Sequence, residues 1–137
     1  MVKRNEMTEP YAKPVYKIAV IEDDVAIRNL YRTKLEYSGF DVQTAEDGVR
    51  GLALLETYQP DLMLLDIRMP EMNGDEMLMK VREHPWGADI RVIVLTNISK
   101  DEAPSVLRFL HVDRYVVKAH YTPSQVIETI EQVLNIR

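Results

Sequence analysis

Short runs rich in apolar residues alternate along this chain with longer stretches in which apolar residues recur at helical spacing. Five of the short runs predict strands, at residues 16–21, 40–45, 61–66, 91–96 and 114–118. A stretch long enough to hold a helix separates each run from the next. Strands that alternate with helices in this way indicate parallel pairing through right-handed crossovers, and therefore an α/β sheet that is covered on both faces.

Five amphipathic stretches supply the predicted helices. The stripes that we expect to face the core are Ile27, Leu30, Tyr31 and Leu35, ended by Gly39; Leu52, Leu55 and Tyr58, ended by Pro60; Met77, Leu78 and Val81; and Val106, Leu107, Phe109 and Leu110. Pro104 is compatible with the fourth of these helices only in its first turn. The fifth helix has the clearest start, with Thr122 as N-cap, Pro123 at the first helical position and Gln125 three residues after the cap.

Length and composition favour one compact domain. The chain has 137 residues, of which 46% are hydrophobic and 28% charged. We interpret residues 1–15, which contain Pro10 and Pro14, as a flexible N-terminal segment, and residues 16–137 as the domain. The chain has no cysteine, no apolar run long enough to span a bilayer and no signal peptide, so the predicted location is the cytoplasm.

The net charge of −5 gives no general attraction to nucleic acid or to an anionic membrane. We therefore expect no direct contact with either of them. An anionic ligand would have to be held by a cation placed locally.

Polar residues follow four of the five predicted strands. Glu22 and Asp23 follow the first strand, Asp66 ends the third, Thr96 the fourth and Lys118 the fifth. In open α/β sheets ligands bind beyond the carboxyl ends of the strands, so these side chains are expected to meet there. Clustered carboxylates repel one another unless a cation joins them, and oxygen ligands without histidine or cysteine suit Mg²⁺.

Each of these residues also has an ordinary structural interpretation. A single carboxylate at a strand end is usually a helix cap or a solvated loop residue, and we assign Asp24 the cap of the first helix. The convergence of several such residues favours a functional site instead. There, Asp66 could serve as metal ligand and nucleophile, with Lys118 and Thr96 binding an incoming phosphoryl group.

The segments "VIEDD", "DLMLLDIRMPEMNG", "VIVLTN" and "RYVVK", in this order and at these spacings, resemble the receiver domain of two-component response regulators. The resemblance covers about residues 16–137. It implies the flavodoxin-like fold of the chemotaxis regulators, a three-layer, doubly wound, five-stranded parallel sheet of strand order 2-1-3-4-5.

The resemblance also implies a role for each residue of the site. Asp66 is expected to be the phosphoacceptor, and Mg²⁺ to be bound by Glu22, Asp23, Asp66 and the backbone carbonyl of Arg68. Thr96 and Tyr115 are expected to be the switch residues, and Lys118 to pair with the phosphoryl group.

Implied partners are a histidine kinase or phosphotransfer protein, which would dock on the first helix near Ile27 and on the loop after the fifth strand, and a downstream protein or effector domain. A homodimer through the fourth helix, fifth strand and fifth helix is also possible. The chain would catalyse only its own phosphorylation and dephosphorylation.

Three positions depart from the usual receiver pattern or tune it. Ala119 follows Lys118 where receivers usually have proline; because a cis bond before a non-proline residue costs about 2.5–4 kcal/mol, we predict a trans Lys118–Ala119 peptide. Asn97 stands where a small residue is usual. Arg68 and Ile98 occupy positions that tune hydrolysis of the acyl phosphate, and since neither is a base, we predict slow decay.

Two other functions fit parts of the pattern. A phosphohydrolase of the haloacid dehalogenase type also uses a strand-end aspartate and Mg²⁺, but it needs a second acid two residues later, where this chain has Arg68. Flavodoxin-like electron transfer needs a phosphate-binding loop after the first strand, and the acidic "EDD" would repel a phosphate there.

Overall fold

The computed structural model describes residues 14–136. The prediction that residues 1–15 are flexible therefore concerns a segment of which residues 1–13 lie outside the described part. None of the helices in the described part is long and apolar enough to cross a membrane.

Five parallel strands form one sheet in the order β2-β1-β3-β4-β5, as predicted. Their bounds lie within a residue of those expected from the sequence: β1 (Lys17–Ile21), β2 (Asp41–Ala45), β3 (Leu62–Leu65), β4 (Arg91–Thr96) and β5 (Arg114–Val117). All four residues of β3 are buried, as are the last four of β1. Continuous burial of this kind is expected for central parallel strands that are covered on both faces.

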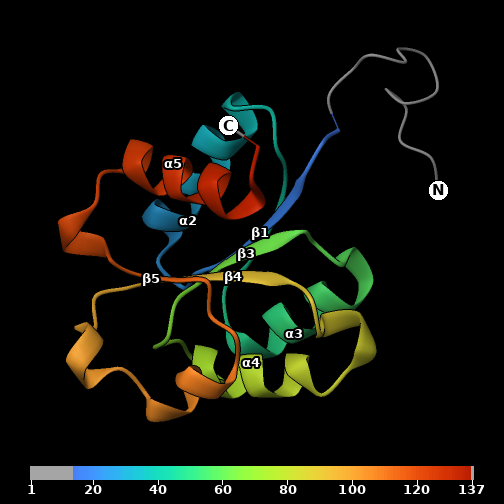
Figure 1. Cartoon of the computed structure of the whole chain (residues 1–137), viewed down its shortest axis with the longest axis vertical. Coiled ribbons are helices and arrows are strands. Elements are labelled where there is room, and N and C mark those ends of the chain that lie inside the picture. The colour runs from blue at the N-terminus through green and yellow to red at the C-terminus, as the bar shows by residue number, and fades with distance from the viewer. Residues whose placement is uncertain (1–13, 137) are drawn as a thin grey trace.

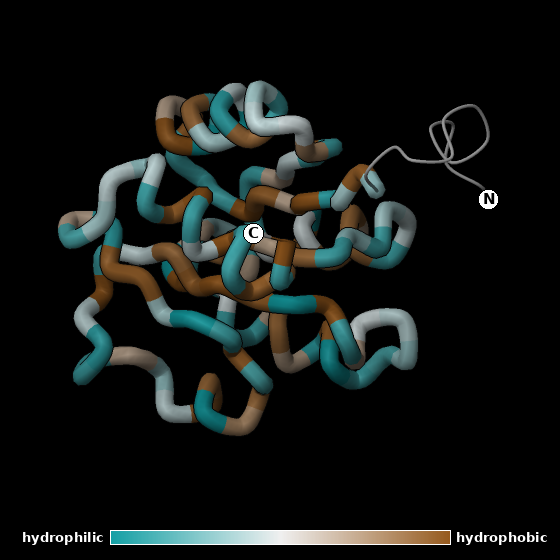
Figure 2. Tube along the Cα trace, turned by 45° about the horizontal axis from the view of Figure 1, so that its top comes forward, coloured by the Kyte–Doolittle hydropathy of each residue, from teal (hydrophilic) through white to brown (hydrophobic). Residues whose placement is uncertain are grey.

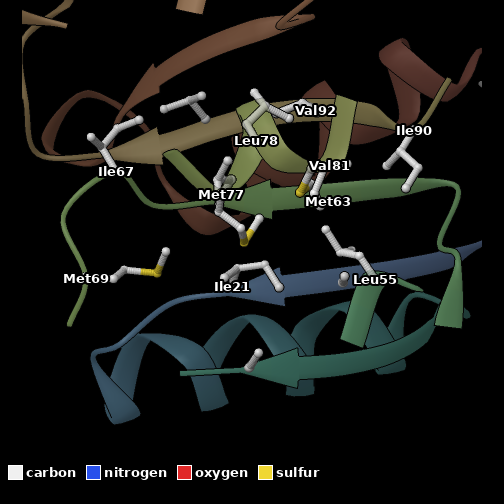
Figure 3. Close-up of a cluster of buried hydrophobic side chains, with 14 of the residues drawn as sticks. Ile21, Leu55, Met63, Ile67, Met69, Met77, Leu78, Val81, Ile90 and Val92 are labelled. Atoms are coloured by element: carbon white, nitrogen blue, oxygen red, sulfur yellow. The ribbon is translucent and has the colours of Figure 1, made fainter. Parts of the chain in front are cut away.

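The sheet is the middle of three layers (Figure 1). The helices α2 (Val25–Tyr37) and α5 (Pro123–Leu134) cover one face, and α3 (Gly48–Tyr58) and α4 (Gly74–Arg82) cover the other. Apolar residues follow the strands through the interior, whereas hydrophilic residues dominate many of the outer turns (Figure 2). The core on the α3 and α4 side brings together side chains from both layers, including Ile21, Leu55, Met63 and Met77 (Figure 3).

Helix starts agree with the caps predicted from the sequence. The Asp24 carboxylate accepts a hydrogen bond from the backbone N–H of Ile27 at 3.0 Å, which caps α2. Thr122 and Gln125 form the predicted capping box at the start of α5. Gly39, the predicted stop after α2, has φ of +96°, a conformation that glycine adopts at no steric cost.

The predicted fourth helix is wrong. Residues 98–111 instead contain two short 3₁₀ helices, η2 (Lys100–Glu102) and η3 (Ser105–Phe109). Ala103 and Pro104 between them are extended, since a residue before proline is disfavoured in the helical region. The five residues left after Pro104 are too few for a stable α-helix. Two side chains of the predicted core stripes are also exposed: Leu30 by 41% and Phe109 by 73%.

Arg82, at the end of α4, forms hydrogen bonds with the turns that precede β4 and β5. Its guanidinium donates to the carbonyl oxygens of Leu110 at 3.0 Å and of His111 at 3.1 Å. It also donates to the carbonyls of Gly87, at the end of η1 (Pro85–Gly87), and of Ile90, both at 2.8 Å. One side chain therefore satisfies backbone acceptors from two loops, which the sequence did not reveal.

Candidate functional site

Four strands deliver polar side chains to one cavity at the carboxyl edge of the sheet. The cavity has a volume of about 400 Å³ and contains the predicted site residues that follow the strands: Glu22, Asp23, Asp66, Thr96 and Lys118. Glu22, Asp66 and Lys118 directly follow β1, β3 and β5, and Thr96 is the last residue of β4. The predicted convergence is confirmed for these five residues.

Three carboxylates lie together in this cavity. Oxygens of Glu22, Asp23 and Asp66 all lie within 4.8 Å of one another. Glu22 is 2% exposed and Asp66 8%, whereas Asp23 is exposed to solvent. All the ligands on offer are carboxylate oxygens at a spacing that a single hard cation, with ligand bonds of about 2.1 Å and bound water, can span. The residues therefore fit Mg²⁺.

Lys118 provides a positive charge between two of these acids. Its ammonium nitrogen lies 2.7 Å from the Glu22 carboxylate and 3.1 Å from that of Asp66. Burial would lower the pKa of Lys118, but hydrogen bonding and the charges of both acids outweigh burial and raise this pKa. Lys118 therefore stays charged at neutral pH.

Glu22 is harder to ionise than an exposed glutamate. Burial raises the pKa of Glu22 from 4.5 to about 7, helped by the negative charge of Asp66 and opposed by the hydrogen bond from Lys118. A single lysine thus does not fully compensate two buried carboxylates. A further cation at this position would relieve the repulsion.

The loop after β3 returns tightly to Asp66. The backbone N–H of Gly74 donates to the carbonyl of Ile67 at 2.6 Å. A Cβ atom at position 74 would lie 2.0 Å from the carbonyl oxygen of Asp66, so only glycine fits there. The Asp66 carboxylate accepts from the N–H of Ile67 at 2.7 Å, which fixes one of its oxygens. The glycine of "MNG" is therefore required by this close approach.

Lys118 reaches the acids without a cis peptide bond. No cis bond occurs among the described residues, so the predicted trans Lys118–Ala119 bond is confirmed. Lys118 opens a short 3₁₀ helix, η4 (Lys118–His120), that leads to the capping box of α5.

The other predicted residues occupy different places around the site. Thr96 is buried at the cavity, where its hydroxyl accepts from the N–H of Ile98 at 3.4 Å. Arg68 is exposed and lines the cavity. The Tyr115 hydroxyl donates to the carbonyl of Ile98 at 2.8 Å, so Tyr115 contacts the segment after Thr96 and is not among the residues lining the Asp66 cavity.

One lining residue was absent from the sequence prediction. Glu102, in η2, contributes to the wall of the Asp66 cavity. No local motif indicated this position, because it depends on the path that the chain takes between Thr96 and Pro104.

A parallel sheet of order 2-1-3-4-5, with an acidic cluster and a lysine at its carboxyl edge, defines a receiver domain. Residues 18–131 match the family described as "Response regulator receiver domain", and the chain belongs to this family. Receiver domains of response regulators are signalling domains. The match assigns the chain to this family, and not to the haloacid dehalogenase-type phosphohydrolases or the flavodoxin-like electron-transfer proteins considered from the sequence.

Individual relatives agree with this assignment. The chain is 40% identical over 84 residues to the "DNA-binding dual master transcriptional regulator RpaA" of Synechocystis sp., covering 61% of this chain and 35% of the relative. It is 33% identical over 119 residues to the "Probable transcriptional regulator ycf27" of Cyanophora paradoxa, covering 86% of this chain and 48% of that protein. The chain thus spans less than half the length of these relatives.

Among solved structures, a CheY-like receiver domain protein from Methanospirillum hungatei superposes with a TM-score of 0.81. It is 28% identical in sequence, and the match covers 89% of this chain and 95% of that chain.

Proposed function

We propose that this chain accepts a phosphoryl group on Asp66 from a histidine kinase or phosphotransfer protein. The observation that supports this most directly is the position of Lys118, 3.1 Å from the Asp66 carboxylate and 2.7 Å from Glu22. Asp66, like Glu22, thereby belongs to the acidic cluster and contacts a fixed cation, and the resemblance to receiver domains assigns the phosphoacceptor role to Asp66. A nucleophilic carboxylate needs both a metal site and a fixed cation to approach an anionic phosphoryl donor.

Glu22, Asp23, Asp66 and the backbone carbonyl of Arg68 are the proposed ligands of Mg²⁺. When bound, the ion would neutralise negative charge on the acids and on the phosphoryl oxygens. The chain's own residues bind the phosphoryl group and carry out its transfer. One Asp66 oxygen attacks phosphorus in line with the leaving group, Lys118 binds a phosphoryl oxygen, and the Thr96 hydroxyl donates to another.

The proposed output is a change in residues 98–111 and in β5. Thr96 lies two residues before the first residue of this segment, Ile98, whose carbonyl accepts a hydrogen bond from the Tyr115 hydroxyl. If Thr96 turns toward the phosphoryl group, the N–H of Ile98 loses its acceptor, and Tyr115 and the segment repack. The surface of 98–111, β5 and α5 would then bind a downstream protein or effector domain, or a second copy of the chain.

We place this activity in the cytoplasm, without direct contact to membrane or nucleic acid. The chain would not act as an enzyme on other substrates.

The test is phosphorylation by acetyl phosphate with Mg²⁺, followed by intact-protein mass spectrometry. Wild type should gain one phosphoryl group. Asp66→Asn should gain none, and Asp101→Asn, which removes an exposed acid outside the cavity, should behave as wild type. Phosphorylation of Asp66→Asn at the wild-type rate would overturn the assignment.

A further inference from the structure

Glu102 is one of the residues that line the phosphoacceptor cavity, and it is exposed to solvent. It comes from η2, the short 3₁₀ helix that exists because residues 98–111 do not form a long helix. The neighbouring acid, Asp101, instead lines a different cavity, beside β5. Two adjacent acids of one turn therefore face two different sites.

The backbone of this turn is fixed while the Glu102 carboxylate is available. The N–H of Glu102 donates to the carbonyl of Ser99 at 3.0 Å, a bond within the turn that does not depend on the contact between Tyr115 and Ile98. Within residues 14–136, the Glu102 carboxylate has neither an ion pair nor a hydrogen bond, and the residue is exposed.

Glu102 is the lining residue best suited to accept a proton. Four of the other lining residues are acids that we assign to the metal or to a helix cap: Glu22, Asp23, Asp66 and Asp24. Two are cationic, Arg68 and Lys118. The rest have no basic atom at neutral pH: Ile27, Thr96, Asn97 and Ile98.

The direction of attack leads to the same residue. In phosphoryl transfer the attacking and leaving oxygens lie roughly in line with phosphorus. During hydrolysis the leaving oxygen belongs to Asp66, which is buried, so water must approach from the open side of the cavity. The exposed Glu102 lies on the wall of that cavity.

We propose that Glu102 is the general base for hydrolysis of the acyl phosphate on Asp66. This inference rests on the proposed function and deepens it. A water oxygen forms a bond to phosphorus, the bond from phosphorus to the Asp66 oxygen breaks, and the proton of the water moves to the Glu102 carboxylate. The products are the Asp66 carboxylate and inorganic phosphate, and the proton passes from exposed Glu102 to solvent. The acyl phosphate should then decay faster than the slow rate predicted from Arg68 and Ile98 alone.

The experiment follows loss of the phosphoryl group after removal of acetyl phosphate, in the presence of Mg²⁺. The variant is Glu102→Gln, which keeps the size of the side chain, and the matched control is Asp101→Asn, which removes the same charge from the same turn. A positioned general base contributes about 10²–10⁴-fold, so Glu102→Gln should slow decay by at least about 100-fold, and a smaller effect would overturn the proposal. The decay of wild type should also slow in D₂O, and that of Glu102→Gln should slow less.

Each alternative has a different outcome. If Glu102 acted only by its charge, its removal would lessen repulsion of the phosphoryl group and leave decay unchanged or faster, which overturns the proposal. Equal slowing in Glu102→Gln and Asp101→Asn overturns it as well. If wild type itself never gains a phosphoryl group, the proposed function fails instead.

Discussion

Replacing Glu22 by glutamine tests the charge balance of the site in the absence of metal. Glu22 is almost completely buried, and burial together with Asp66 raises its pKa from 4.5 to about 7. One pKa unit corresponds to about 1.4 kcal/mol. Ionising Glu22 in the folded protein therefore costs up to about 3 kcal/mol more than in the unfolded chain.

The pH dependence follows from the direction of this shift. Between pH 4.5 and 7 the folded state binds more protons at Glu22 than the unfolded state does. The stabilising contribution is complete below pH 4.5 and is lost as the pH rises through 7. Glutamine cannot ionise, so the metal-free Glu22→Gln variant should lose less stability than wild type between pH 5 and 8. Relative to wild type, the variant should gain about 1–3 kcal/mol over this interval.

The assay is urea denaturation in EDTA at pH 5 and pH 8, repeated with saturating Mg²⁺. Asp23→Asn is the matched control, because Asp23 belongs to the same cluster but is exposed, and its neutralisation should change the metal-free curves less. Wild type should gain stability from Mg²⁺ by mass action, and both variants should lose most of that gain. Parallel pH dependence of wild type and Glu22→Gln in EDTA would refute the reasoning.

Three further predictions concern positions around the site. Ile27→Ala should slow transfer from a kinase more than transfer from acetyl phosphate, because Ile27 belongs to the predicted docking helix α2 and lines the cavity; equal slowing would indicate a packing role only. Gly74→Ala should lower the free energy of unfolding by at least about 2 kcal/mol, measured in urea, because its Cβ would overlap the Asp66 carbonyl oxygen. Arg82→Met should lower the free energy of unfolding by about 1–3 kcal/mol, because it leaves backbone carbonyls of two loops unpaired. The fluorescence of Trp86, the only tryptophan, should also change. Unchanged hydrogen exchange in the turn before β5 would contradict this prediction.

The strands and helix caps were predictable because their signals are local, whereas the strand order came from the resemblance to receiver domains. The apolar runs that define the strands and the caps at Asp24 and Thr122 act within a few residues, and each was placed correctly. The convergence of Asp66 with Lys118 was also predictable, although the two residues are far apart in sequence. It follows from a general property of parallel sheets, whose strands end at the same edge.

Residues 98–111 could not be predicted in the same way. Their apolar spacing suits a helix, but Pro104 divides the stretch, and each part is too short to sustain one. The path that results depends on contacts distant in sequence, from Arg82 at one end and Tyr115 at the other. Glu102 was missed for the same reason, since its place at the cavity depends on that path.

The same segment connects the chemistry of the site to its surface. A long helix in this position would be stabilised by a continuous ladder of backbone hydrogen bonds, whereas residues 98–111 have only those of two short 3₁₀ turns and depend also on the Tyr115 hydroxyl and the Arg82 guanidinium. His111, in the turn that Arg82 holds, has φ of +54°, a conformation that costs a residue with a side chain free energy. The cost of rearranging the segment is therefore set by a few side-chain contacts. The inward movement of Thr96 that we propose acts at the first of them, through the N–H of Ile98, and a change there reaches Glu102, four residues further along the segment.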